Sequence, residues 1–243
     1  MRTFLLFTAA TLCLSAQVTL RPPAFGCQVT ATGALRSLYG VPSSVFAEVV
    51  TNEVVSASCS SRLTLYQTGD RVVLLSGEER YEFESAEPLL LAAGDGVAAA
   101  VSPSTGMMRI WSQGAWAESP EPLPSGVRTL RLTGISLMAL VDDRIITINV
   151  NTNVQETHLL PFTITSPVAV ITPDSIITIV DSTWNRCGPS GCQPLSRAPS
   201  GVTSLTVLNQ QWLTAHLENG DSLAVRPSAT GVESFQLPGE DRL

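Results

Sequence analysis

The chain has 243 residues, of which 44% are apolar and only 14% are charged, so it carries enough apolar side chains to build a sizeable core. Its 21 acidic residues outnumber 14 basic ones, and the resulting formal net charge of −7 argues against a protein that binds nucleic-acid phosphates. Every basic residue is an arginine, which excludes a Schiff-base lysine, a Walker-type phosphate lysine and a serine–lysine hydrolase.

Residues 1–16 have the composition of a secretory signal. Arg2 is followed by an apolar run over residues 4–14 and by two small residues that end at Ala16. This order is typical of a cleavable signal, and the run is shorter than the roughly 20 apolar residues that span a membrane. We predict cleavage after Ala16 and a secreted or periplasmic protein without a transmembrane segment in the mature chain. A lipid anchor on Cys13 is the alternative.

Three later stretches share one pattern: a strand, a Thr-containing turn that closes in Gly or Asn, a second strand and a proline. They span residues 28–42, 148–161 and 225–238. Gly33, Asn153 and Gly231 suit the turns because glycine and asparagine tolerate the positive φ of tight hairpins. We expect the hairpins to join third and fourth strands. The first of them, together with a possible strand at Val18 to Arg21, predicts a three-stranded N-terminal unit.

Apolar strands recur along the chain at a nearly fixed spacing. They begin near residues 62, 97, 136, 175 and 211, so successive copies lie 35, 39, 39 and 36 residues apart. A run such as Ile176 to Val180 has no polar side and suits a strand buried between two neighbouring sheets. A four-stranded unit of about 38 residues cannot bury both of its faces alone, so the copies must stack around an axis. The spacing predicts an all-β propeller, with a two-layer β-sandwich as the alternative.

One stretch connects these repeats to a known family. Residues 166–182, with the turn Pro173-Asp174, and the Thr-Gly or Thr-Asn turns of the three hairpins resemble the YVTN-type β-propeller repeat of secreted bacterial proteins. The Tyr-Val-Thr-Asn string itself is absent, and most copies lack the Pro-Asp turn. The resemblance implies a propeller over most of the mature chain and carries little information about activity.

We therefore expect one propeller domain over residues 17–243, with five four-stranded blades and an N-terminal partial blade. The expected blades span approximately residues 17–45, 46–88, 89–127, 128–167, 168–203 and 204–239. Because the last blade is already complete, we expect the ring to close without a strand shared by the two termini. We also expect a monomer.

Four cysteines follow the signal: Cys27, Cys59, Cys187 and Cys192. An even number in an exported chain indicates two disulfides, for which three pairings exist. Cys187 and Cys192 enclose a Gly-Pro-Ser-Gly turn that brings two strand ends together, which favours a local bridge and leaves Cys27 to pair with Cys59. The alternative is a metal site, but the cysteines lack paired spacings and neither histidine is near them in the sequence.

No motif in the sequence marks a reaction centre. His158 and His216 lie in strand-like runs, and we interpret both as ordinary sheet residues. The signatures of zinc proteases, α/β-hydrolases, calcium loops and phosphate loops are absent, so we predict no catalytic residue, metal site or cofactor. Over residues 78–84, alternation places Tyr81 and Phe83 on one face and glutamates on the other, as in an outer strand with one solvated face.

Trp111 and Trp116 flank a Gln-Gly turn, and we single them out as a possible binding surface, with packing between blades as the alternative. A regular repeat without a reaction centre predicts an exported, non-catalytic binding or scaffold protein for an unidentified protein or small ligand. One alternative is a cation-dependent propeller hydrolase or lactonase with carboxylates facing the axis. The other is a cell-surface adhesin that uses exposed tryptophans.

Overall fold

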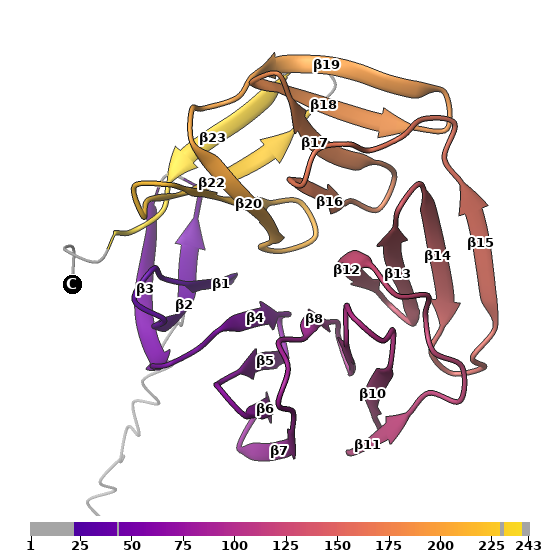
Figure 1. Cartoon of the computed structure of the whole chain (residues 1–243). Coiled ribbons are helices and arrows are strands. Elements are labelled where there is room, and N and C mark those ends of the chain that lie inside the picture. Colours follow the sequence, from indigo (N-terminus) through magenta and orange to yellow (C-terminus); the bar gives the residue numbers. More distant parts are fainter. Residues whose placement is uncertain (1–21, 43, 229–230, 240–243) are drawn as a thin grey trace, which may run out of the picture.

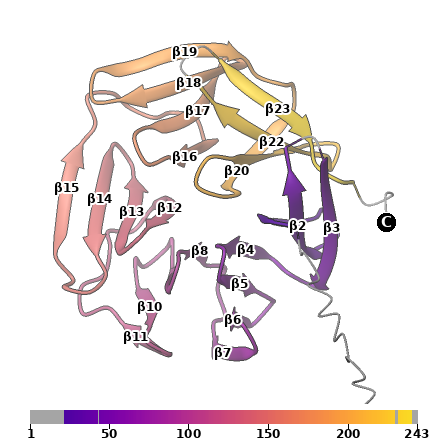
Figure 2. The same cartoon turned by 180° about the vertical axis from the view of Figure 1, so that it is seen from behind.

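Six antiparallel sheets stand around a common centre in the computed structural model, which describes residues 22–42, 44–228 and 231–239 (Figures 1 and 2). Five sheets have four strands and the first has three. Strands that follow each other along the chain are neighbours, and the first strand of each sheet lies nearest the centre. The predicted all-β propeller with six blades, one of them partial, is confirmed. The described part of the chain contains no helix that is long and apolar enough to cross a membrane.

Each blade is a simple meander of consecutive strands. The strands of the first three blades are β1 (Ala24–Val29), β2 (Leu35–Val41), β3 (Ser44–Thr51), β4 (Ser56–Cys59), β5 (Leu63–Gln67), β6 (Arg71–Ser76), β7 (Glu79–Glu84), β8 (Leu90–Ala93), β9 (Val97–Val101), β10 (Met108–Ser112) and β11 (Ala115–Glu118). The strands of the last three blades are β12 (Val127–Thr133), β13 (Ser136–Val141), β14 (Arg144–Asn149), β15 (Gln155–Leu159), β16 (Ala169–Ile171), β17 (Ile176–Val180), β18 (Thr183–Gly188), β19 (Gly191–Arg197), β20 (Val202–Val207), β21 (Leu213–Leu217), β22 (Ser222–Pro227) and β23 (Val232–Gln236).

The apolar repeats of the sequence are the second strands of five blades, β5, β9, β13, β17 and β21. In β9 every residue is buried, because a neighbouring blade covers each face of this sheet. Side chains of adjacent blades share their apolar clusters. Val101 and Ile110 of the third blade, for example, belong to one cluster with Leu137 and Ile148 of the fourth. No blade buries its apolar faces by itself.

The first blade departs from the expected boundaries. The hairpin over residues 28–42 joins β1 to β2, the first and second strands, instead of a third and a fourth strand. After Pro42 the chain turns back as β3, so the boundary expected between residues 45 and 46 lies inside a strand and is wrong. Proline suits a tight turn between paired strands as well as the end of a unit, and the sequence alone does not separate the two. The strand expected at Val18 to Arg21 lies outside the described residues.

Both predicted disulfides are present. Cys27 in β1 is bonded to Cys59 in β4, with Cα atoms 5.8 Å apart, so this bridge links the innermost strands of the first two blades. Cys187 in β18 and Cys192 in β19 lie opposite each other with Cα atoms 3.9 Å apart and bridge a hairpin. All four sulfur atoms are thus used, and the metal-site alternative for these cysteines is wrong.

The ring closes by packing between the first and last blades, each of which keeps its own strands. Phe25 of β1 packs against Trp212 and Phe235 of the last blade, with ring centroids 5.9 and 5.8 Å away. The blades approach so closely that a Cβ atom on Gly26 would lie 2.5 Å from the carbonyl oxygen of Leu208. Gly26 also has a φ of 145°, a value that side chains disfavour, so glycine is required at this contact.

Arg36 of β2 adds a polar clasp to this closure. Its side chain is buried, and its Nη1 donates to the carbonyl oxygen of Gly239 at 3.0 Å and to that of Pro238 at 3.5 Å. Both acceptors belong to the segment that follows β23, so Arg36 ties the end of the last blade to the first blade.

We expect Arg36→Ala to lower the free energy of unfolding by about 1–3 kcal/mol, because it removes hydrogen bonds from a charged donor to two partly buried carbonyls. Urea unfolding measures the change. Arg80→Ala is the control, since it breaks an exposed ion pair with Glu82 that contributes less than about 1 kcal/mol. Equal losses in the two variants would contradict the clasp.

Candidate binding channel

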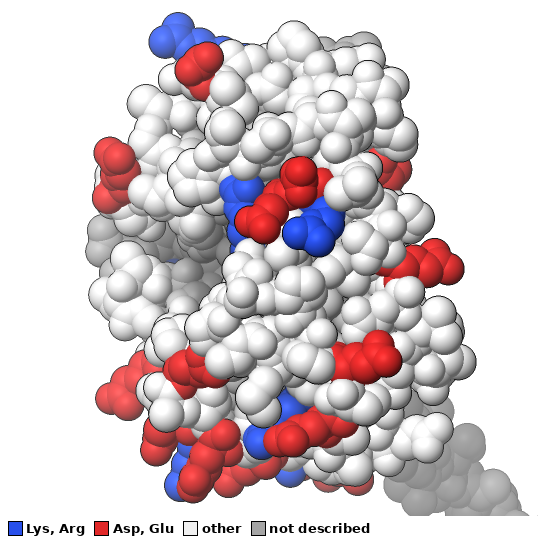
Figure 3. Space-filling model, turned by 45° about the vertical axis from the view of Figure 1, so that its right-hand side comes forward, with Lys and Arg blue, Asp and Glu red and all other residues white. Residues whose placement is uncertain are grey.

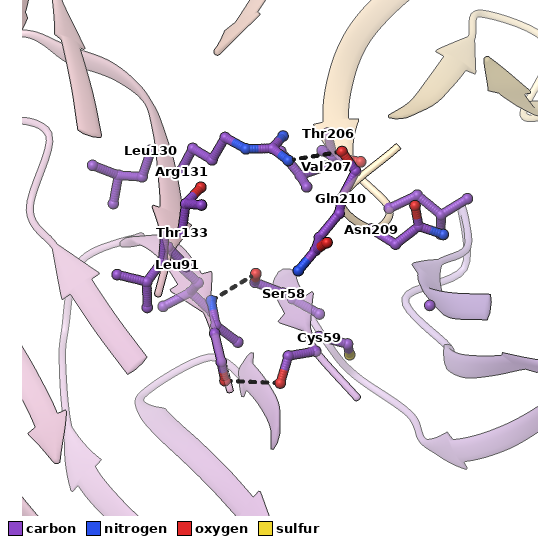
Figure 4. A pocket seen from close by; sticks show the side chains of 18 of the residues that line it. Ser58, Cys59, Leu91, Leu130, Arg131, Thr133, Thr206, Val207, Asn209 and Gln210 are labelled. Carbon is purple, nitrogen blue, oxygen red and sulfur yellow. Dashed lines mark hydrogen bonds between the residues drawn. The ribbon is translucent and has the colours of Figure 1, made fainter. Parts of the chain in front are cut away.

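The innermost strands of the ring enclose a cavity of about 650 Å³ at the centre of the molecule. Its wall is built from β1, β4, β8, β12 and β20 and from the turn that follows β20 (Figure 4). Cavities of roughly 300–1,000 Å³ hold small ligands in proteins. The channel is therefore the candidate functional site.

Hydroxyl groups hold two of these inner strands together at the channel wall. The Ser58 Oγ in β4 accepts a hydrogen bond from the Ala93 backbone nitrogen at 3.0 Å, and the Ser60 Oγ donates to the Gly94 carbonyl at 2.8 Å (Figure 4). Both bonds run from the second blade to the third. This part of the wall is consequently fixed by contacts between blades as well as within them.

Arg131 of β12 reaches from the fourth blade to the fifth and sixth blades. Its Nη1 donates to the Ile171 carbonyl at 3.3 Å, and its Nη2 donates to the Gln210 carbonyl at 3.1 Å. The residue is only 4% exposed, and its buried Nε has no hydrogen-bond partner. Burial lowers the pKa of Arg131, while the carboxylate of Asp174 opposes this shift. The guanidinium group remains a cation at neutral pH, because arginine is not deprotonated in proteins.

The turn after β20 presents Gln210 to the channel. Asn209 stabilises the turn, since its Oδ1 accepts from the backbone nitrogens of Gln211 and Trp212, both at 2.9 Å. The Asn209 Nδ2 also donates to the Phe25 carbonyl at 2.8 Å, which attaches the turn to the first blade. Figure 4 shows the Gln210 amide directed into the cavity. Gln210 is exposed, so its amide is accessible to solvent and to a ligand in the channel.

The charge of the channel differs from that of the outer surface. The residues that line the cavity include two arginines, Arg128 and Arg131, and one carboxylate, Asp95. Arg128 donates to the carbonyls of Ile164 and Ser166 instead of to a carboxylate. The outer surface in Figure 3 carries many acidic side chains, several of them next to arginines. An acidic protein thus has a cavity whose lining is net positive.

The two predicted tryptophans lie at the blade interface, away from the channel. Trp111 is only 6% exposed and packs on Tyr81, with ring centroids 5.2 Å apart. Trp116 is half-buried against Phe83 at 4.8 Å. Both partners belong to β7, so the tryptophans join the second and third blades. Trp111 was predicted as part of a binding surface, but its ring is buried between two blades and contributes to their packing.

The histidines occupy separate blades and have ordinary sheet environments. His216 in β21 is half-buried, with its Nδ1 3.1 Å from the Ser222 Oγ and its Nε2 3.3 Å from the Thr206 Oγ1. His158 is exposed on β15, with its Nε2 3.8 Å from the Glu156 carboxylate. Within the described ranges, no three His, Cys, Asp or Glu side chains gather in a way that would hold a metal ion.

Neither Arg131 nor Gln210 belongs to a motif that predicts a binding residue from the sequence. The sequence does contain one signal for Arg131. The first strand of each blade lies nearest the axis, and a long cationic side chain in such a strand is unusual. The alternation of β12 is interrupted, however, because the strand has a bulge between Val127 and Thr129. Simple alternation along the strand therefore does not give the direction of its side chains.

Burial lowers the pKa of His216 below its ordinary value of 6.5, so the unfolded chain binds this proton more readily than the folded chain does. We expect the free energy of unfolding to fall as the pH drops below about 6.5 and towards the pKa of the folded state, by at most about 1.4 kcal/mol per pH unit. His216→Gln should remove this part of the dependence in urea unfolding between pH 7.5 and 5.0. His158→Gln should keep it, and an unchanged slope in His216→Gln would contradict the assignment.

No protein-family model and no curated protein matches the sequence. Among solved structures, Hsv2 of Kluyveromyces lactis overlaps 87% of this chain and 82% of its own, with 10% identity and a TM-score of 0.50. A chain of the mitotic checkpoint complex overlaps 86% of this chain and 74% of its own, with 16% identity and a TM-score of 0.49. Hsv2 of Kluyvelomyces marxianus overlaps 86% and 82%, with 10% identity and a TM-score of 0.47. At these identities the likeness concerns the fold alone, and the first overlap supports a six-bladed propeller.

Proposed function

We propose that this protein is an exported, non-catalytic binding propeller whose ring is the scaffold and whose central channel is the binding site. The observation that carries the proposal is a ligand-sized cavity whose wall combines apolar side chains with polar groups, among them the exposed amide of Gln210. A cavity of this composition gives a ligand both apolar contact and a few oriented hydrogen bonds.

The construction of the wall supports a binding role. Its residues lie on strands whose outer neighbours are packed between blades, and hydroxyls such as that of Ser58 fasten one inner strand to the next. A wall that is rigid before the ligand arrives reduces the entropy lost on binding. The channel therefore suits recognition of one ligand shape more than accommodation of many.

The lining chemistry favours binding over the two alternative functions. The cation-dependent hydrolase requires several carboxylates around the axis, whereas Asp95 is the single carboxylate in the described lining, and its Oδ1 accepts from the Ser61 hydroxyl at 2.8 Å. The adhesin requires exposed tryptophans, whereas Trp111 is buried and Trp116 is half-buried. Neither alternative has a specific observation in its favour.

Export is the second part of the proposal. It rests on the signal-like residues 1–16, which lie outside the described residues, and on the two disulfides of the ring. Disulfides persist in secreted and periplasmic proteins and are rare in the cytosol. The resemblance to repeats of secreted bacterial propellers agrees with this location, and we propose a secreted or periplasmic protein that works as a monomer.

We expect the exported protein to begin at Gln17 and to contain no free thiol. Intact mass after alkylation of the protein from the exported fraction measures both properties. A chain without residues 2–16 should remain in the cytoplasm. Recovery of that shortened chain outside the cytoplasm, or four alkylated cysteines in the exported protein, would contradict export with both disulfides formed.

Filling the channel should abolish ligand binding. Thr133 ends β12 and lines the cavity, so Thr133→Trp places a large side chain inside it. Thr157→Trp on β15, the outer strand of the same blade, is the matched control. We expect a panel of amino acids, organic acids and sugars to contain compounds that raise the Tm of the wild type and the control but not that of Thr133→Trp. Compounds that stabilise all three proteins equally, or that are turned over, would contradict the proposal.

A further inference from the structure

The channel contains a buried cation that no carboxylate of the described residues pairs with. Arg131 is absent from every ion pair within residues 22–42, 44–228 and 231–239. Its two Nη atoms donate to neutral backbone carbonyls, and its Nε has no acceptor. A buried charge without a counter-ion costs free energy, and the folded chain leaves this cost in place.

Asp174 is the acidic residue that acts electrostatically on Arg131, but its carboxylate is engaged elsewhere. Its Oδ1 accepts from the Thr172 Oγ1 at 3.1 Å and from the Ser175 Oγ at 3.2 Å, so it caps the turn before β17. Asp174 is also exposed, and water screens its charge. Within residues 22–42, 44–228 and 231–239, no carboxylate therefore supplies the counter-charge of Arg131 inside the channel.

The surroundings of Arg131 define what a ligand would meet. The exposed amide of Gln210 offers a second donor (Figure 4). Leu91 of β8 and Val207 of β20 also line the cavity, and the parts of their side chains that are not packed between blades offer apolar surface. The Arg131 bond to the Gln210 carbonyl joins a cation to a neutral acceptor, whereas a carboxylate acceptor would add the attraction between opposite charges to the hydrogen bond. A carboxylate at this point would thus improve on the contact that it replaces.

We propose that the channel binds a small organic carboxylate, with Arg131 as its counter-charge, Gln210 as a second donor, and Leu91 and Val207 in contact with its apolar part. This inference rests on the proposed function, because it names the ligand class of the same channel. The lining carries two arginines and one aspartate, a net charge that matches one carboxylate. A phosphate brings roughly −1.5 to −2 charges and no apolar part, so it fits this lining less well.

The test compares pairs of compounds that differ in charge and little in shape. Benzoate is compared with benzamide, succinate with succinamide, and inorganic phosphate is included as an anion without an apolar part. Binding to the full exported protein is followed by the shift in Tm and by titration calorimetry. We expect the carboxylates to bind and the amides to bind at least about 10-fold more weakly, since a hydrogen bond to a charged group contributes about 1.5–3 kcal/mol.

Two variants assign the preference to the channel. Arg131→Gln should weaken benzoate binding by about 10- to 100-fold. Arg80→Gln, which removes the same charge from an exposed position on β7, should change it less than about threefold. If Arg131→Gln does not fold, Arg131→Lys replaces it as the test variant. This variant keeps the positive charge, so it should still bind benzoate more tightly than benzamide. The comparison within the wild-type protein needs no variant.

The outcomes separate this inference from the proposed function. Equal binding of carboxylates and amides, or equal benzoate binding by wild type and Arg131→Gln, would overturn the carboxylate site. Binding of phosphate alone would also overturn it. If neutral compounds stabilise the wild type but not Thr133→Trp, the binding channel stands and only the carboxylate class is wrong. If no compound of either panel binds, both proposals are wrong.

Discussion

Each blade buries its apolar faces only against its neighbours, so the stability of the whole ring depends on its closure. Val101 and Leu137, for instance, are fully buried only because the third and fourth blades share one cluster. If the first and last blades separated, Phe25 and Trp212 would both become exposed to water. Because each blade contacts only its two neighbours, a loss at this contact would leave the first and last blades each packed on one side only. The Cys27–Cys59 disulfide and the Arg36 clasp lie on the two sides of the blade that completes the ring.

Arginines supply polar links between blades, where the hydrogen-bonded sheets end. Arg36 donates to the segment after the last blade, Arg128 to the segment before the fifth, and Arg131 to the fifth and sixth blades. In each case the acceptors are backbone carbonyls. The planar, forked guanidinium reaches two such carbonyls at once, whereas a lysine presents a single charged point. A chain with arginine as its sole basic residue is thus well suited to linking sheets that share no strand.

The fold could be predicted from the sequence because its signal is periodic. Five apolar strands at nearly equal spacing gave the blades, and the turn between Cys187 and Cys192 favoured the local disulfide. The first blade was harder, since Pro42 marks a turn inside the blade where a boundary was expected. The channel could not be predicted. The bulge in β12 breaks the alternation of residues along that strand, and the position of Gln210 depends on a turn held by the side chain of Asn209. Such local irregularities leave little trace in the alternation of residues.

The structural use of arginine explains how an acidic protein acquires a positive channel. On the outer strands arginines pair with carboxylates, as Arg109 does with Glu118 at 2.7 Å and Arg71 with Glu82 at 3.5 Å, so their charges cancel locally. At the axis, Arg131 and Arg128 bond to neutral carbonyls, so their charges are not cancelled. The surplus of carboxylates is exposed to water, where solvent and salt screen it. The cations at the axis lie in a partly enclosed cavity, where screening is weaker and an anion experiences their field more strongly. The arginines whose hydrogen bonds link the blades, Arg128 and Arg131, therefore also make the channel attractive to anions.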